Sequence, residues 1–196
     1  MTTLPLKDAL RQEALAMLAE GTAPEALNMR ALARRLGVSH QAPYKHYPDR
    51  DHLLAAIVTG AFRDFARHLE DRPRHDDPFE DLEEMGRAYL GFARSEPLKY
   101  HLIFVAPHPP VEDADLQAAG RAAFGLLEAR MASLPRGPAP GPDAPEVDAL
   151  IVWSALHGFA ALAYPAGKGI SPAETQKAAP GIEDRLLARI TASLKS

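Results

Sequence analysis

The stretch that decides the fold covers residues 28–50 and reads NMRALARRLGVSHQAPYKHYPDR. Asn28 is a good helix N-cap, because its side chain can accept a hydrogen bond from an unpaired backbone N–H. The residues that follow predict a helix over 29–36, with its leucines on the buried side. Gly37 can take the left-handed conformation with which many helices end. The first half of the stretch therefore predicts one short, capped helix.

The second half of the stretch predicts another helix, over residues 40–47, with Ser39 as its N-cap. Pro43 falls in or near the first turn of this helix, where a missing N–H costs little, so we expect an intact helix. Two helices across a three-residue turn form a helix-turn-helix. In such units the second helix enters the major groove of DNA while its flanks contact phosphates.

Basic residues dominate this stretch. They are Arg30, Arg34, Arg35, Lys45 and Arg50, against Asp49 as the acidic residue. The whole chain is acidic, with 22 Lys and Arg against 26 Asp and Glu and a net charge of −4. A local basic patch on an acidic protein predicts one dedicated surface for a polyanion. An ordinary helical hairpin with a glycine turn is the alternative, and the charge cluster favours DNA binding over it.

The motifs around this unit follow a specific order. An amphipathic N-terminal segment is followed by Asn28-Met-Arg-x-Leu-Ala, Gly37-Val-Ser, Tyr44-Lys-His-Tyr and Pro48-Asp-Arg-Asp-x-Leu-Leu. This order resembles the DNA-binding domain of the TetR family of transcriptional regulators, over roughly residues 6–58. In that family, residues at four such positions contact the DNA backbone. The resemblance assigns that role here to Asn28, Tyr44, Tyr47 and Arg50.

The chain departs from the family at residues 41–43, where Gln-Ala-Pro replaces a small Gly-Thr-Leu run. Gln41 is the best candidate for base reading, because its amide can pair with an adenine edge through two hydrogen bonds. His40 and Lys45 are the next candidates. The full set of candidate DNA-binding residues is Asn28, Arg30, Ser39, His40, Gln41, Tyr44, Lys45, Tyr47 and Arg50.

Hydrophobic periodicity predicts helices throughout the chain and no strands. Besides those above, helices are expected over residues 6–20, 49–70, 79–94, 97–105, 115–134, 145–163 and 181–194. We expect an all-α protein with a DNA-binding domain over residues 1–58 and an effector-binding and dimerisation domain over residues 59–196.

Composition restricts the remaining possibilities. The chain has 196 residues and no cysteine, which excludes disulfides, thiol catalysis and cysteine zinc sites. Charged residues interrupt the first apolar stretch, so we expect no signal peptide. The longest apolar run, residues 149–164, is shorter than the roughly 20 residues of a membrane span. These features predict a cytoplasmic protein without a membrane partner, a metal site or a cofactor.

The second domain offers aromatic side chains that can line an effector pocket. The candidates are Tyr89, Phe92, Tyr100, Phe104, Phe124, Trp153 and His157. Trp153 and His157 are four residues apart and share a helix face, where the imidazole needs a polar partner. Simple core packing is the alternative interpretation of all these residues. We expect a mainly apolar or aromatic effector, because few polar groups converge here.

A second resemblance concerns the C-terminal half. The runs Pro97-Leu98-x-Tyr100 and Trp153-x-x-x-His157-Gly158 are similar to a C-terminal domain of one TetR branch that is known for a Trp-His-Gly motif. TetR proteins are typically homodimers in which the last two helices form a four-helix bundle. The sequence permits this, because small residues recur at 154, 158 and 161 and apolar residues at 182, 186, 190 and 194.

The resemblance to the TetR family implies a mechanism. A homodimer would bind a palindromic operator in double-stranded DNA, block transcription, and release the DNA when a small-molecule effector tilts the helix over residues 49–70. Two half-sites are read together only about 34 Å apart, so a small change in head separation can abolish binding. The operator, the effector and the sign of regulation stay open.

Two other classes of function remain. An enzyme is disfavoured, because the eight histidines lack the spacing of metal ligands or of a catalytic triad. A ligand sensor or partner-binding protein that has lost DNA binding is the stronger alternative. The intact Asn28, Tyr44, Tyr47 and Arg50 argue against that loss. A specific, salt-sensitive DNA complex would separate these classes.

Overall fold

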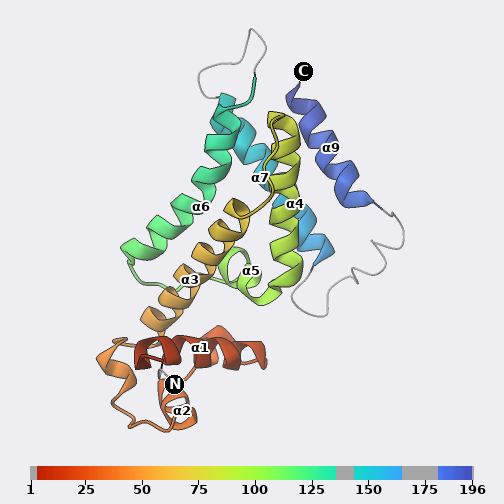
Figure 1. Ribbon diagram of the computed structural model, residues 1–196. Coiled ribbons are helices and arrows are strands. Elements are labelled where there is room, and N and C mark those ends of the chain that lie inside the picture. Colours follow the sequence, from red (N-terminus) through yellow and green to blue (C-terminus); the bar gives the residue numbers. More distant parts are fainter. Residues whose placement is uncertain (1–3, 136–143, 165–180, 196) are drawn as a thin grey trace.

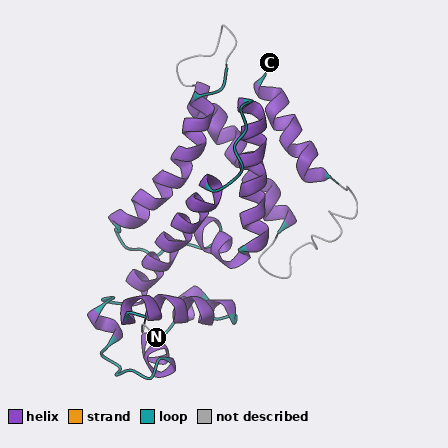
Figure 2. Ribbon diagram, viewed as in Figure 1, coloured by secondary structure: helices purple, strands orange, loops and turns teal. Residues whose placement is uncertain are grey.

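A computed structural model describes residues 4–135, 144–164 and 181–195 of the protein. Every regular element in these three segments is helical (Figure 2). This confirms the all-α class. The helices form two parts, a small head that contains the N-terminus and a larger body that contains the C-terminus (Figure 1).

The head contains the helix-turn-helix stretch. Its elements are α1 (Leu6–Ala19), η1 (Pro24–Ala26), α2 (Met29–Arg35), η2 (Pro43–Lys45) and the first turns of α3 (Arg50–Glu70). In Figure 1, α1 lies between the body and α2. The side of the head that carries α2 therefore faces away from the body.

The body consists of the rest of α3 and five further helices. These are α4 (Pro78–Ser95), α5 (Pro97–Phe104), α6 (Ala114–Ala132), α7 (Ala144–Ala163) and α9 (Ile182–Leu194). All begin and end within two residues of the ranges that periodicity predicts, which confirms those helices. The core of the body forms where α3 packs against α4, α5 and α6.

Helix α3 connects the head to the body without a break. It begins after Asp49, whose carboxylate accepts a hydrogen bond from the His52 N–H at 2.9 Å. Leu53 is fully buried in the head and Phe65 is fully buried in the body. Residue 58 lies inside this helix, so the division of the chain at that residue stays a prediction.

A buried ionic cluster stabilises the body at the end farthest from the head (Figure 1). Asp81 of α4 accepts from Arg72 at 2.7 Å and lies 3.2 Å from Arg130 of α6. Burial alone would raise the pKa of Asp81, but the His75 N–H and the two guanidinium groups together lower it below its ordinary value. The cluster ties the α3–α4 connection to α6.

Helix α7 leaves an apolar face uncovered. Leu150, Ile151 and Leu162 are 59%, 58% and 70% exposed. Within the described segments, α7 is the helix whose length and composition would suffice to cross a membrane. The apolar stretch that meets this criterion lies within residues 145–163, and 28% of it is buried. Helix α7 is longer than the predicted apolar run because it begins at Ala144.

Candidate nucleic-acid interface and effector site

Helix α2 forms as the sequence predicts. The Asn28 side-chain oxygen accepts from the backbone N–H of Arg30 at 2.9 Å and of Ala31 at 3.2 Å, so the predicted N-cap is confirmed. Gly37 has a φ of 67°. That conformation lets the Val38 N–H donate back to the Ala33 carbonyl at 3.0 Å and close the helix.

The prediction of a helix over residues 40–47 is wrong. The structure has turns followed by the short 3₁₀ helix η2. The Ala42 N–H donates to the Ser39 carbonyl at 2.9 Å, three residues back. Ser39 therefore contributes its carbonyl, and η2 begins after Ala42 without a side-chain cap.

The error lies in the position assigned to Pro43. Counted from Ser39 as the cap, Pro43 is the fourth residue, which is the first whose N–H an α-helix needs for a bond to the cap carbonyl. Proline has no N–H, so that bond cannot form, and its ring crowds the same carbonyl. The segment instead closes through tighter bonds that reach only three residues back, with the His46 N–H donating to the Pro43 carbonyl at 3.0 Å.

The segment over residues 39–45 nevertheless presents most of the candidate DNA-binding residues to solvent. Ser39, His40, Gln41 and Lys45 are exposed, and the Tyr44 ring is 42% exposed. Asn28 and Arg30 are exposed as well. Seven of the nine candidates are thus accessible on the head, and their contacts with DNA stay a prediction.

Tyr47 lies differently from Tyr44. Its side chain is only 4% exposed, and its hydroxyl donates to the Lys7 carbonyl of α1 at 3.3 Å. Burial raises the pKa of Tyr47 above its ordinary value. Tyr47 therefore anchors η2 to α1, and a contact with DNA would have to be made by its hydroxyl.

Two of the five basic residues in the stretch are neutralised from outside it. Arg35 pairs with Glu13 of α1 and, at 2.6 Å, with Glu20. The hydrogen bond from Arg35 lowers the pKa of Glu20. Arg50 is the ninth candidate and is half-buried, with Asp51 at 2.6 Å and the Glu25 carbonyl at 2.5 Å.

Three basic residues of the stretch remain without an ion pair in the described part of the chain. They are Arg30, Arg34 and Lys45, called the unpaired cations below. The sequence count included Arg35 and Arg50 because it considered acids inside the stretch only. The excess of charge available to a polyanion is therefore smaller than counted, and it lies on α2 and η2.

The aromatic candidates of the second domain come together in the body. Tyr89 stacks on Phe104 with 6.0 Å between ring centroids, Phe104 meets Trp153 at 5.5 Å, and Trp153 meets Phe124 at 4.8 Å. Phe92 is separate from this chain of rings and packs instead against Phe65, at 5.1 Å. Six of the seven candidates thus share one cluster, which we call the aromatic cluster.

His157 has the polar partner that its position requires. Its Nδ1 lies 2.9 Å from the Tyr100 hydroxyl, which is 3.3 Å from the Tyr89 hydroxyl. Burial raises the pKa of Tyr100 to about 12 and raises that of Tyr89 further. Both tyrosines are therefore neutral near pH 7 and can exchange hydrogen bonds with His157. A role of this cluster in effector binding stays a prediction.

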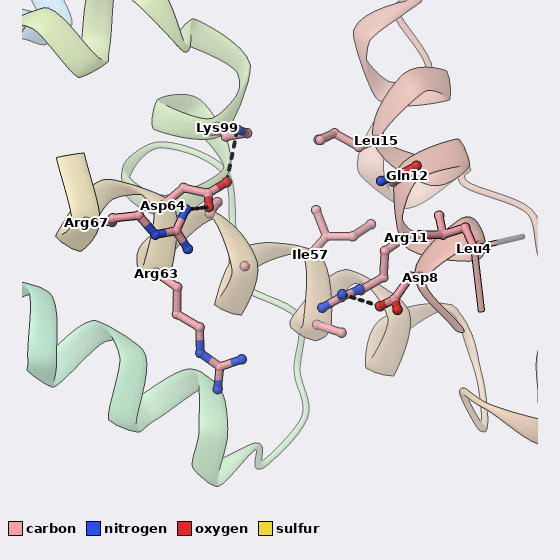
Figure 3. A pocket seen from close by; sticks show the side chains of 13 residues that line it. Leu4, Asp8, Arg11, Gln12, Leu15, Ile57, Arg63, Asp64, Arg67 and Lys99 are labelled. Atoms are coloured by element: carbon pink, nitrogen blue, oxygen red, sulfur yellow. Dashed lines mark hydrogen bonds and ion pairs between the residues drawn. The ribbon is translucent and has the colours of Figure 1, made fainter. Parts of the chain in front are cut away.

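Sequence reasoning missed a groove between the head and the body. Its volume is about 490 Å³, and it is lined by α1, α3 and Lys99 of α5 (Figure 3). The lining side chains belong to three separate helices and include the buried Ile57 and Ala61, so no single periodic pattern reveals them. Among the described residues, no group of His, Asp and Glu has the arrangement of a metal site.

Two family profiles match the chain. Residues 12–57 match "Bacterial regulatory proteins, tetR family", and residues 82–184 match "Tetracyclin repressor-like, C-terminal domain". The second match covers about half of the chain by itself. Neither description specifies a Trp-His-Gly branch, so that subtype stays a prediction.

Curated relatives match over part of the chain. HTH-type transcriptional regulators of Mycobacterium bovis and Mycobacterium tuberculosis are 33% identical over 87 residues, which is 42% of this chain. The chain spans 37% of the length of these relatives.

Solved structures share the fold over nearly the whole chain. A protein of unknown function from Rhodococcus sp. RHA1 has a TM-score of 0.73 and 25% identity, covering 98% of this chain and 94% of that one. AibR, solved in complex with isovaleryl coenzyme A and operator DNA, has a TM-score of 0.63 and 15% identity, covering 96% of this chain and 97% of that one. With the two family profiles, which together span the head and most of the body, these matches place the chain in the TetR family of bacterial regulatory proteins.

Proposed function

We propose that this protein is a ligand-responsive transcriptional repressor that binds a palindromic operator as a homodimer in the cytoplasm. The observation that carries the proposal is the exposed segment over residues 39–45, which lies on the head beside cations that have no acidic partner in the described segments. Phosphate contacts supply most of the affinity of a DNA-binding protein, and accessible cations are what they require.

Base reading would fall to few side chains. With η2 in place of a full helix, Gln41 and His40 lie on a turn before Pro43. Gln41 can pair with adenine, and Tyr44 and Lys45 can contact the backbone on either side. Arg50 is held by the Asp51 carboxylate and the Glu25 carbonyl, so its proposed role is to fix the start of α3 close to the DNA backbone.

The uncovered face of α7 supports the homodimer. Leu150, Ile151 and Leu162 expose an apolar surface of the kind that protein interfaces cover. Gly158 and Ala161 are exposed on the same helix and permit close approach of a second helix. Such a dimer would hold two heads at a fixed separation, as a palindrome requires.

The aromatic cluster is the proposed effector site. It contacts α3 through Phe65, which meets Tyr89 at 5.3 Å and Phe104 at 5.4 Å between centroids. An effector that separates these rings would shift α3 and with it the head. Such a ligand changes DNA affinity only through its different affinities for the two states of the protein.

The proposal is tested by selection of DNA from a randomised pool with the full-length protein, followed by sedimentation of the selected complex. We expect an enriched palindrome that binds one dimer and resists excess unrelated DNA. Leu150→Glu with Ile151→Glu should yield monomers with much weaker binding to the palindrome, whereas Glu146→Gln on the same helix should behave as wild type. A pool without enrichment would reject DNA binding and favour a ligand sensor that has lost it.

A further inference from the structure

The groove between head and body has the size of a small-molecule site. Its main hollow of about 490 Å³ shares Gln12, Leu15 and Lys99 with a second hollow of about 410 Å³ between α1 and α5. Both volumes lie within the roughly 300–1,000 Å³ of ligand sites. The shared residues show that the two hollows adjoin each other, and together they are called the groove below; no residue of the aromatic cluster lines either hollow.

Cations predominate in the main hollow. Arg11, Arg63, Arg67 and Lys99 line it, against the carboxylates of Asp8 and Asp64. Figure 3 shows Asp8 and Arg11 on one side, Asp64, Arg67 and Lys99 on the other, and Ile57 between them. The hollow therefore has more positive than negative groups on its walls.

The existing ion pairs do not use all of this positive charge. Asp64 serves both Arg67 at 3.1 Å and Lys99 at 3.0 Å, and Lys99 also lies 3.3 Å from Glu96, which lines the second hollow. Arg63 has a single ionic contact in the described segments, 3.9 Å to Asp115, and the Asp115 side chain is 83% exposed. Since a guanidinium has five N–H donors, Arg63 can bind an additional anion without losing a strong partner.

The walls of the second hollow are mainly apolar. Leu15, Ala16 and Ala19 of α1 face Pro97 and Leu98 of α5 there. Lys99 lies where this apolar part meets the cationic part. An acidic group and an apolar chain on one molecule would match the two parts of the groove at once.

We propose that the groove binds a small amphiphilic anion, with its acidic group among Arg11, Arg63 and Arg67 and its apolar chain between α1 and α5. This site is distinct from the proposed effector site in the aromatic cluster. The ligand would contact α1 of the head and α5 of the body together, so its binding would depend on how the two are oriented.

The experiment is calorimetric titration of the full-length protein, without DNA, with octanoate, 1-octanol and octylamine. We expect octanoate to bind, and the neutral and cationic molecules of the same chain length to bind at least about tenfold more weakly, because neither can accept charge-assisted hydrogen bonds as a carboxylate does. Equal binding of octanoate and 1-octanol, or no binding of octanoate, would overturn the proposal.

Variants locate the site. Arg63→Gln should weaken octanoate binding about tenfold, because the side chain that meets the acidic group is then uncharged. Arg121→Gln removes an exposed charge from α6 outside the groove and should leave the affinity unchanged. His157→Phe should also leave the octanoate affinity unchanged. If His157→Phe weakened octanoate binding while Arg63→Gln bound octanoate as tightly as the wild type, the ligand would lie in the aromatic cluster instead. Thermal melts check that each variant is folded, and since DNA is absent, the result does not depend on operator binding.

Discussion

Arg35 and Lys45 belong to the same basic stretch but have opposite surroundings. Arg35 faces α1 and pairs with Glu13 and Glu20, whereas Lys45 lies in η2 and has no ion pair in the described part of the head. Tyr44 and Tyr47 differ in the same way, because one is exposed and the other is packed on α1. Basic and tyrosine side chains that face α1 therefore stabilise the head, whereas those that face away from α1 remain available for DNA.

The largest effect is expected from Tyr47→Ala. Removing this buried ring should lower the free energy of unfolding by about 3 kcal/mol, since large aromatic truncations in cores cost about 3–5 kcal/mol. Denaturant unfolding measures the change. Tyr44→Ala is the matched variant and should leave stability within about 0.5 kcal/mol while weakening DNA binding. Equal destabilisation of both variants would remove the distinction between the two tyrosines.

A slightly smaller effect is expected from replacing Arg30, Arg34 and Lys45 together with Ala. Removing three phosphate-binding cations should weaken binding to the selected palindrome about a hundredfold, because hydrogen bonds to charged groups contribute about 1.5–3 kcal/mol each and the effects of neighbouring substitutions are not fully additive. Fluorescence anisotropy at fixed salt measures it. An unchanged affinity would show that the unpaired cations do not contact DNA.

The contrast is sharpened by Arg35→Ala, which removes a paired cation from the same helix. We expect DNA affinity to change less than about threefold, because the charge is compensated by two carboxylates and screened at physiological salt. The same anisotropy titration measures it. An effect as large as that of the triple variant would mean that Arg35 leaves its partners when DNA binds.

A change of conformation with little change in stability is expected from Pro43→Ala. The new N–H can donate to the Ser39 carbonyl, so residues 40–47 should move toward an α-helix, and the free energy of unfolding should change by less than about 1 kcal/mol. Backbone chemical shifts of this segment report the conformation. Shifts that stay those of a turn would show that Pro43 is not what shortens η2.

Local rules predict the helices of this protein well and its charges less well. The cap at Asn28, the turn at Gly37 and the start of α3 after Asp49 depend on neighbouring residues, so the sequence reveals them. Pro43 lies one position beyond the part of a first helical turn that tolerates proline, and this small difference makes η2 a 3₁₀ helix instead of an α-helix.

The remaining differences come from tertiary contacts. Sequence spacing can show that Arg35 is basic but not that α1 brings Glu13 and Glu20 to it. Sequence spacing also predicts that Trp153 and His157 share one helix face. The hydrogen bond between His157 and Tyr100, however, requires α5 and α7 to meet. The groove at Arg63 escapes prediction for the same reason, because its walls belong to separate helices.

The most direct test of the central claim is the salt dependence of binding to the selected palindrome. Plots of log affinity against log salt concentration should be steep for the wild type, and the slope should fall by about 0.9 for each phosphate that is no longer neutralised. We expect the variant without Arg30, Arg34 and Lys45 to neutralise about three fewer phosphates per head, and Arg35→Ala to keep the wild-type slope. Equal slopes for all three proteins would contradict the assignment of the DNA interface to the unpaired cations.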